Sequence, residues 1–137
     1  MPHISFQLNH LAILVVAVIL WLLGALWYSP AGFGKKWMVM VGISKDAKPK
    51  GMMLGMVSSF ICNVVLAFVL DHLIVWANAY TFKWGAFIGS LVWIGFFATP
   101  SLPQYIYEGR PFKLFAINYG YWFLGLIIAG GVLAIWR

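Results

Sequence analysis

The sequence contains few charged residues. Asp, Glu, Lys and Arg make up only 9% of its 137 residues, whereas they make up about 25% of an ordinary soluble domain. A water-soluble chain of this length could not cover its surface with so few charges. Because 64% of the residues are hydrophobic, the composition indicates a protein whose surface lies in a membrane.

Cysteine and acidic residues are scarce as well. The single cysteine, Cys62, excludes an internal disulfide bond. The sequence contains three acidic residues, and it shows no paired carboxylates, no nucleophile beside a base and no phosphate-binding loop. We therefore predict that the protein is not an enzyme and that it uses no cofactor.

Long uncharged stretches dominate what is present. They cover residues 11–34, 51–70, 84–107 and 114–136. A helix needs about 20 apolar residues to cross the bilayer core, whereas buried strands are usually about 4–8 residues long. The pattern predicts an all-α, polytopic membrane protein: a single domain of four transmembrane helices at about 8–29, 51–72, 82–107 and 112–136.

The basic residues predict the orientation of these helices. Two loops on one side hold Lys35, Lys36, Lys45, Lys48, Lys50, Arg110 and Lys113. The other side has only Lys83 and Arg137. Because basic residues in short loops mark the cytoplasmic side, we expect both termini outside the cell. The net charge of +6 then reflects topology, and we expect the lipid bilayer, not nucleic acid, as the partner of the lysines.

The first predicted helix ends in WYSPAGFGKKW, residues 27–37. Pro30 prevents the helix from continuing, aromatic rings favour the headgroup level, and lysines attract anionic phosphates. The stretch that follows could lie flat in the interface with Trp37, Met38 and Met40 dipped into it. We predict five membrane-interface anchors: Trp27, Tyr28, Lys35, Lys36 and Trp37.

Small and polar residues recur at every fourth position of the second predicted helix. They are Gly51, Gly55, Ser59, Asn63, Ala67 and Asp71. Residues four apart share one helix face, and small residues let helices approach closely in lipid. We expect this face to contact protein and to form a homo-oligomer. The third helix repeats the spacing weakly, with Gly85 and Gly89, and the fourth places Asn118, Tyr121, Gly125 and Ala129 on one side.

The third predicted helix contains Pro100 and Pro103. Each proline removes a backbone donor, and we expect a helix kinked at these residues. The alternative is a broken helix that borders a small polar cavity, where the side chain of Thr99 could satisfy freed backbone groups. Such interruptions are where transporters bind substrates.

The remaining polar residues allow two interpretations each. Asn63 and Asn118 bridge helices, or they line a permeation path together with Thr99. Asp71 lies about 30 Å along the helix from Gly51, which places it at the outer surface. With His72 and His10 it forms a weak candidate metal site, against ordinary surface or capping roles, and we predict no bound metal.

Two stretches carry a family resemblance: GALWYSPAGFGKKWMVMVG (24–42) and EGRPFKLFAINYGYWF (108–123). They resemble the domain-of-unknown-function 1761 family of small bacterial integral membrane proteins. The resemblance implies a four-helix membrane protein, placed in the bacterial inner membrane, and brings no activity or ligand. Two functions stay open: a homo-oligomer with a transport or channel role, and an accessory subunit packing against a larger membrane complex.

Overall fold

The computed structural model describes residues 8–43 and 51–136, and all regular structure within them is helical. The helices are α1 (His10–Trp27), α2 (Gly34–Val41), α3 (Met52–Trp76), α4 (Phe82–Val92), η1 (Trp93–Ala98), α5 (Thr99–Tyr107) and α6 (Phe112–Ile135). The four spans lie close to the predicted ranges, except that α3 continues beyond residue 72 to Trp76. The predicted roles of Lys45, Lys48, Lys50 and Arg137 fall outside the described residues.

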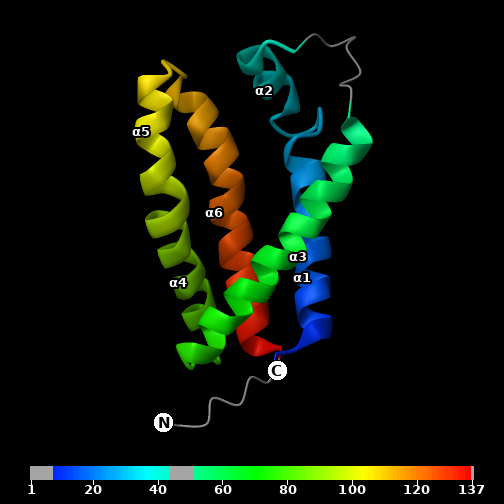
Figure 1. Ribbon diagram of the computed structural model, residues 1–137, viewed down its shortest axis with the longest axis vertical. Helices are drawn as coiled ribbons and strands as arrows, with labels where there is room; N and C mark the ends of the chain where they lie inside the picture. The colour runs from blue at the N-terminus through cyan, green and yellow to red at the C-terminus, as the bar shows by residue number, and fades with distance from the viewer. Residues whose placement is uncertain (1–7, 44–50, 137) are drawn as a thin grey trace.

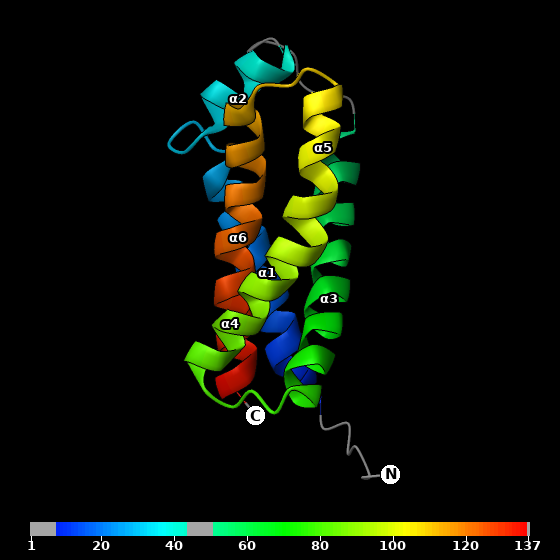
Figure 2. The ribbon, with the colours of Figure 1, turned by 90° about the vertical axis from the view of Figure 1, so that its left-hand side faces the viewer.

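Four helices are long and apolar enough to cross a membrane: α1, α3, the continuous helix Phe82–Tyr107 and α6. The all-helical fold predicted from the uncharged stretches is thus confirmed. α1 begins and α6 ends at the same end of the molecule, which we call the terminal end (Figure 1). The opposite end, called the α2 end, holds α2, the start of α3 and the turn between α5 and α6 (Figure 2).

α6 is the central helix of the bundle. It contacts α4, η1 and α5 on one side and α1 and α3 on the other (Figure 1). α1 and α3 form a second pair, and the main core lies where they meet α6 near the terminal end. Its fully or almost fully buried side chains include Ala12, Val16, Leu20, Leu126 and Leu133. This half of the bundle is therefore closed by apolar packing.

The closest helix contact joins α4 to α6 through glycines. A Cβ atom on Gly85 would meet the carbonyl oxygen of Gly130 and the Cβ of Ala134, and one on Gly89 would meet the carbonyl oxygen of Leu126. Only glycine allows two backbones to approach this closely. The short turn at Glu108–Pro111, with Gly109 at φ 67°, joins the helix Phe82–Tyr107 to α6 and makes them antiparallel neighbours, as predicted.

The prolines do not interrupt the third span. η1 is a π-helical segment that ends at Ala98, and α5 continues through both Pro100 and Pro103. Pro100 has no N–H to donate to the carbonyl group four residues earlier. In a π-helical turn the backbone hydrogen bonds join residues five apart instead of four, which changes the bonding where this α-helical bond is missing. The irregularity therefore precedes the prolines, and the structure shows neither the expected kink at Pro100 and Pro103 nor the alternative of a broken helix.

The face of small residues on α3 divides into two parts. Asn63 and Ala67 are buried, whereas Gly51, Gly55 and Ser59 are exposed. The difference arises because α3 leans away from α6 towards the α2 end (Figure 1). Among residues 8–43 and 51–136, only the half of α3 nearer the terminal end buries this face against other helices.

The expectation for Asp71 is wrong. We placed its carboxyl group at the outer surface, but the side chain is 0% exposed. α3 continues to Trp76, so Asp71 lies inside the helix, on the same buried face as Asn63 and Ala67. The four-residue spacing from Asn63 and Ala67, not the distance from Gly51, decides the burial of Asp71.

Candidate functional site

The loop after α1 folds back over the end of that helix. The backbone N–H of Phe33 donates to the carbonyl oxygen of Trp27 at 2.7 Å, and that of Gly34 donates to Ser29 at 3.1 Å. A Cβ on Gly32 would lie 2.5 Å from the Trp27 carbonyl oxygen, so the turn requires glycine there. As a result α2 returns over the bundle, and Trp37 packs against the α5–α6 pair.

Trp27 and Tyr28 join α1 to α6. The indole N–H of Trp27 donates to the carbonyl oxygen of Ile117 at 2.9 Å, and the hydroxyl of Tyr28 donates to Asn118 Oδ1 at 2.8 Å. Gly24 lies directly against the ring of Tyr121, which brings the helices close. The two residues that we predicted as lipid anchors therefore make specific contacts within the protein.

Asn118 connects three segments at the α2 end. Its Oδ1 accepts the hydrogen bond from Tyr28, and its Nδ2 donates to the hydroxyl of Tyr105 in α5 at 3.0 Å. The hydroxyl of Tyr121 donates to the carbonyl oxygen of Leu20 at 2.6 Å. Burial, and to a lesser extent the neighbouring tyrosines, raises the pKa of Tyr28, which lies just past the end of α1. Its phenol therefore keeps the proton that it donates.

A cavity of about 670 Å³ lies beside this network, and we call it the crevice. Its lining residues are Trp21, Gly24, Ala25, Tyr28, Trp37, Met52, Gly55, Met56, Ser59, Asn118 and Tyr121. α1 and α3 form its facing walls, where Gly24, Ala25, Gly55 and Ser59 leave space because their side chains are small. The crevice is thus a direct consequence of small residues on both walls and of the tilt of α3.

The family of the chain follows from a comparison with protein-family models. Residues 11–134 match the model described as "Protein of unknown function (DUF1761)". The chain belongs to the DUF1761 family. Neither the curated proteins nor the solved structures contain a match to it. The two stretches that carry the resemblance meet in space, because Trp27 and Tyr28 bind Ile117 and Asn118.

Sequence reasoning missed two residues of the site in this DUF1761 protein. Trp21 donates its indole N–H to the carbonyl oxygen of Met56 at 3.2 Å and packs edge-on against Phe60, which ties α1 to α3 at one end of the crevice. Tyr105 holds Asn118 from α5. Trp21 lies seven residues before Tyr28, and this helical spacing was a signal for a shared face. The sequence carried no comparable signal for Tyr105.

Other predicted site residues of the DUF1761 protein lie elsewhere. Thr99 is exposed and donates to the Gly95 carbonyl of its own helix at 2.9 Å, so no hydrogen bond links it to Asn118. Gly125 is buried, and a Cβ there would lie 2.9 Å from Leu20 Cδ2. Asn63 is 1% exposed, and its Nδ2 has no hydrogen-bond partner among the described residues. The three polar residues proposed for one path are therefore not joined by hydrogen bonds.

The described histidines of the DUF1761 protein, His10 and His72, belong to different helices. His10 is exposed at the start of α1. His72 lies 2.8 Å from the Phe68 carbonyl oxygen through Nδ1 and packs against the rings of Phe68 and Trp76. Across residues 8–43 and 51–136, no three His, Cys, Asp or Glu side chains are grouped as metal ligands.

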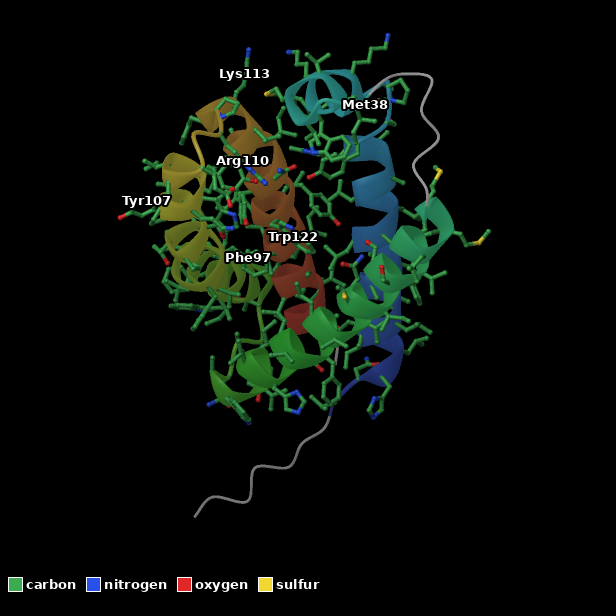
Figure 3. All side chains as sticks on the ribbon, turned by 45° about the horizontal axis from the view of Figure 1, so that its top comes forward. Met38, Phe97, Tyr107, Arg110, Lys113 and Trp122 are labelled. Carbon is green, nitrogen blue, oxygen red and sulfur yellow. The ribbon has the colours of Figure 1, made fainter. Side chains whose placement is uncertain are left out.

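Basic side chains surround the α2 end of the DUF1761 protein. Lys35 and Lys36 lie in the first turn of α2. Arg110 and Lys113 lie at the α5–α6 turn (Figure 3). Glu108 is the one acidic residue at this end within the described chain, and its carboxylate pairs with Arg110 at 2.9 Å. The positive charge of this end is therefore largely uncompensated by the described protein groups.

Proposed function

We propose that this DUF1761 protein is a non-enzymatic carrier of a small solute in the inner membrane of a bacterium. The α2 end would face the cytoplasm, with both termini outside. The observation that carries this proposal is the crevice, where the polar groups of Tyr28, Ser59, Asn118 and Tyr121 line a cavity within a helical membrane domain. Polar groups at membrane depth mark substrate pathways more often than they mark lipid contact.

The asymmetry of the bundle supports a carrier. The crevice opens at the α2 end, whereas Ala12, Val16 and Leu133 close the terminal end by tight packing. A carrier exposes its site to one side of the membrane at a time, and this arrangement corresponds to a state open to the cytoplasm. The basic residues at the α2 end support that orientation, because cytoplasmic loops are enriched in Lys and Arg.

A contact in a homo-oligomer, or a contact with a larger membrane complex, would use the same small-residue surface where we place the solute. Gly55 and Ser59 of α3 face Gly24 and Ala25 of α1 across the crevice, and small residues on a helix are typical of close helix contacts in lipid. A helix from a second copy, or from a larger complex, would therefore fit where we place the solute. The polar groups of Tyr28 and Asn118 favour the solute, since a packing helix would gain nothing specific from them.

The proposal is tested by flux into liposomes that contain the purified full-length protein. The probes are acetate, glycerol and K⁺, and the matched variants are Gly55→Leu, which fills the crevice, and Gly95→Leu. A Cβ at either glycine meets no atom within 4 Å, so neither change should disturb folding. We expect flux of at least one probe that Gly55→Leu abolishes and Gly95→Leu retains. Absence of flux for every probe, or equal flux in both variants, would refute the carrier function.

A mass measurement of the same samples separates the alternatives. A monodisperse oligomer that Gly55→Leu dissociates would assign the small face of α3 to a second copy. Purification with another protein in fixed stoichiometry would instead indicate an accessory subunit. A monomer that conducts a probe would support the carrier.

A further inference from the structure

We infer that the crevice binds an anionic amphiphile, with its acyl chain between α1 and α3 and its acidic group beside Lys35 and Lys36 of α2. This inference rests on the proposed carrier function, because it names the class of molecule that the same crevice takes. Neither the family assignment nor the fold specifies a ligand. The argument uses the lining of the crevice, its opening and the charges around it.

The crevice wall suits an acyl chain. Trp21, Ala25, Met52 and Met56 present apolar surface, and no atom lies within 4 Å of a Cβ built on Gly55. Water in this space would meet mainly groups that cannot hydrogen-bond, whereas methylene groups would match the wall. Methionine side chains also adapt their shape to flexible apolar ligands.

The position of the crevice gives a chain from the bilayer a way in. α3 leans away from α6 at the α2 end (Figure 1), and residues 51–59, at and just before the start of α3, are all exposed. In a bilayer this exposed side of α3 would face lipid, so the crevice would be open sideways to acyl chains as well as towards the cytoplasm at the α2 end. An amphiphile could then place its chain in the crevice while its head group stays at the membrane surface, where α2 lies.

The charges around the crevice select an anion. Lys35 and Lys36 directly precede Trp37, which lines the crevice, and both lysines are exposed in the first turn of α2. The helix dipole disfavours cations at that position, so a nearby anion would compensate them. Among the described residues no carboxylate lines the crevice and Glu108 is paired with Arg110, so this part of the chain offers a cation no counter-ion.

Tyr28 and Asn118 retain hydrogen-bonding capacity towards the head of the ligand. Asn118 uses one N–H for Tyr105 and its Oδ1 for Tyr28, which leaves its second N–H free to donate. The Tyr28 oxygen can still accept. Carboxylate, ester or phosphate oxygens near the mouth of the crevice would accept from Asn118, and this contact would fix the depth of the chain.

Native mass spectrometry of the full-length protein in neutral detergent tests the inference. The probes are palmitate, a phosphatidylglycerol and a phosphatidylcholine of the same chain length. We expect the anionic probes to bind about tenfold more tightly than phosphatidylcholine, a difference that two lysines at a membrane surface can supply. Lys35→Gln with Lys36→Gln should remove this preference.

Matched variants locate the site. Gly55→Leu and, independently, Ser59→Leu should lower the affinity for the anionic probes about tenfold or more, whereas Gly95→Leu should leave it unchanged. Crevice-dependent binding of palmitate identifies a free carboxylate as the source, and that of phosphatidylglycerol identifies a membrane head group. Either result supports the inference.

Three results would overturn the inference: equal binding of phosphatidylcholine, equal binding by the Gly55→Leu and Gly95→Leu variants, and a second copy of the chain that occupies the crevice instead of a probe. The carrier function can fail separately. Crevice-dependent binding without flux would leave this inference intact and refute the carrier. Flux of acetate or glycerol without amphiphile binding would refute only the inference.

Discussion

Replacing Gly85 by alanine should destabilise this protein, whereas the same replacement at Gly55 should not. A Cβ on Gly85 would lie 2.6 Å from the Ala134 Cβ and even closer to the carbonyl oxygen of Gly130. Carbon atoms in contact are normally about 3.5–4.0 Å apart, so α4 and α6 would have to separate by about 1 Å. Both contacts involve atoms close to the backbone, which cannot rotate away.

The expected magnitudes follow from two opposing effects. Overpacking of a close contact costs about 1–3 kcal/mol, and alanine recovers about 1 kcal/mol relative to glycine through helix propensity. The net loss at Gly85 should therefore be up to about 2 kcal/mol. A Cβ at Gly55 meets no atom within 4 Å, so only the propensity effect applies there, and stability should rise by up to about 1 kcal/mol.

Unfolding of the purified protein by SDS in mixed micelles, followed by circular dichroism, measures both changes. Gly89→Ala should behave like Gly85→Ala, because its Cβ would meet the carbonyl oxygen of Leu126. Gly95→Ala is a second control in open space. If the changes at Gly85 and Gly55 have the same sign and size, the close contact between α4 and α6 is not the interface that stabilises the bundle.

Three further predictions concern the α2 end and the orientation. The Tyr28–Asn118 hydrogen bond should contribute about 0.6–1.7 kcal/mol in a double-mutant cycle of Tyr28→Phe and Asn118→Leu, as side-chain hydrogen bonds do in other membrane proteins; additive effects would contradict the bridge. Absorbance titration should show that Tyr28→Phe removes no phenolate signal below pH 10, because burial raises the pKa of this tyrosine; loss of signal at lower pH would contradict its burial. In a Cys62→Ala background, Lys36→Cys should react with an impermeant maleimide only from the cytoplasm and Lys83→Cys only from outside; the reverse pattern would invert the topology.

The positions of the spans were predictable, and the pairing of helix faces was not. The predicted range 82–107 has the bounds of the observed helix Phe82–Tyr107, because Lys83 in its first turn and Glu108 just past its end mark the limits of the apolar stretch. The pair Gly85 and Gly89 was a weaker signal in the sequence than the longer series of small residues on α3. Yet this pair brings α4 into close contact with α6, because Gly130 of α6 offers an equally small surface opposite Gly85.

The residues of the candidate site were likewise predictable from the sequence, but their contacts were not. Tyr28 and Asn118 were both identified from the sequence, as an anchor and as a bridging or path residue, but nothing in their spacing indicated that they bind each other over 90 positions of chain. That contact depends on the return of α2 and on the closeness of α1 and α6 at Gly24. Asp71 was misplaced because its position was inferred from distance along α3, whereas its burial depends on the helix face that it shares with Asn63 and Ala67.

The sequence by itself determined that the chain forms four long apolar helices with most of its basic residues at one end. This follows from composition alone, because a bilayer excludes charge and requires every backbone group to be paired within a helix. Only the tertiary structure decided which helices meet and where they part. In lipid that choice depends on the fit between small faces of two partners, and the tilt of α3 that opens the crevice is a property of the packed bundle.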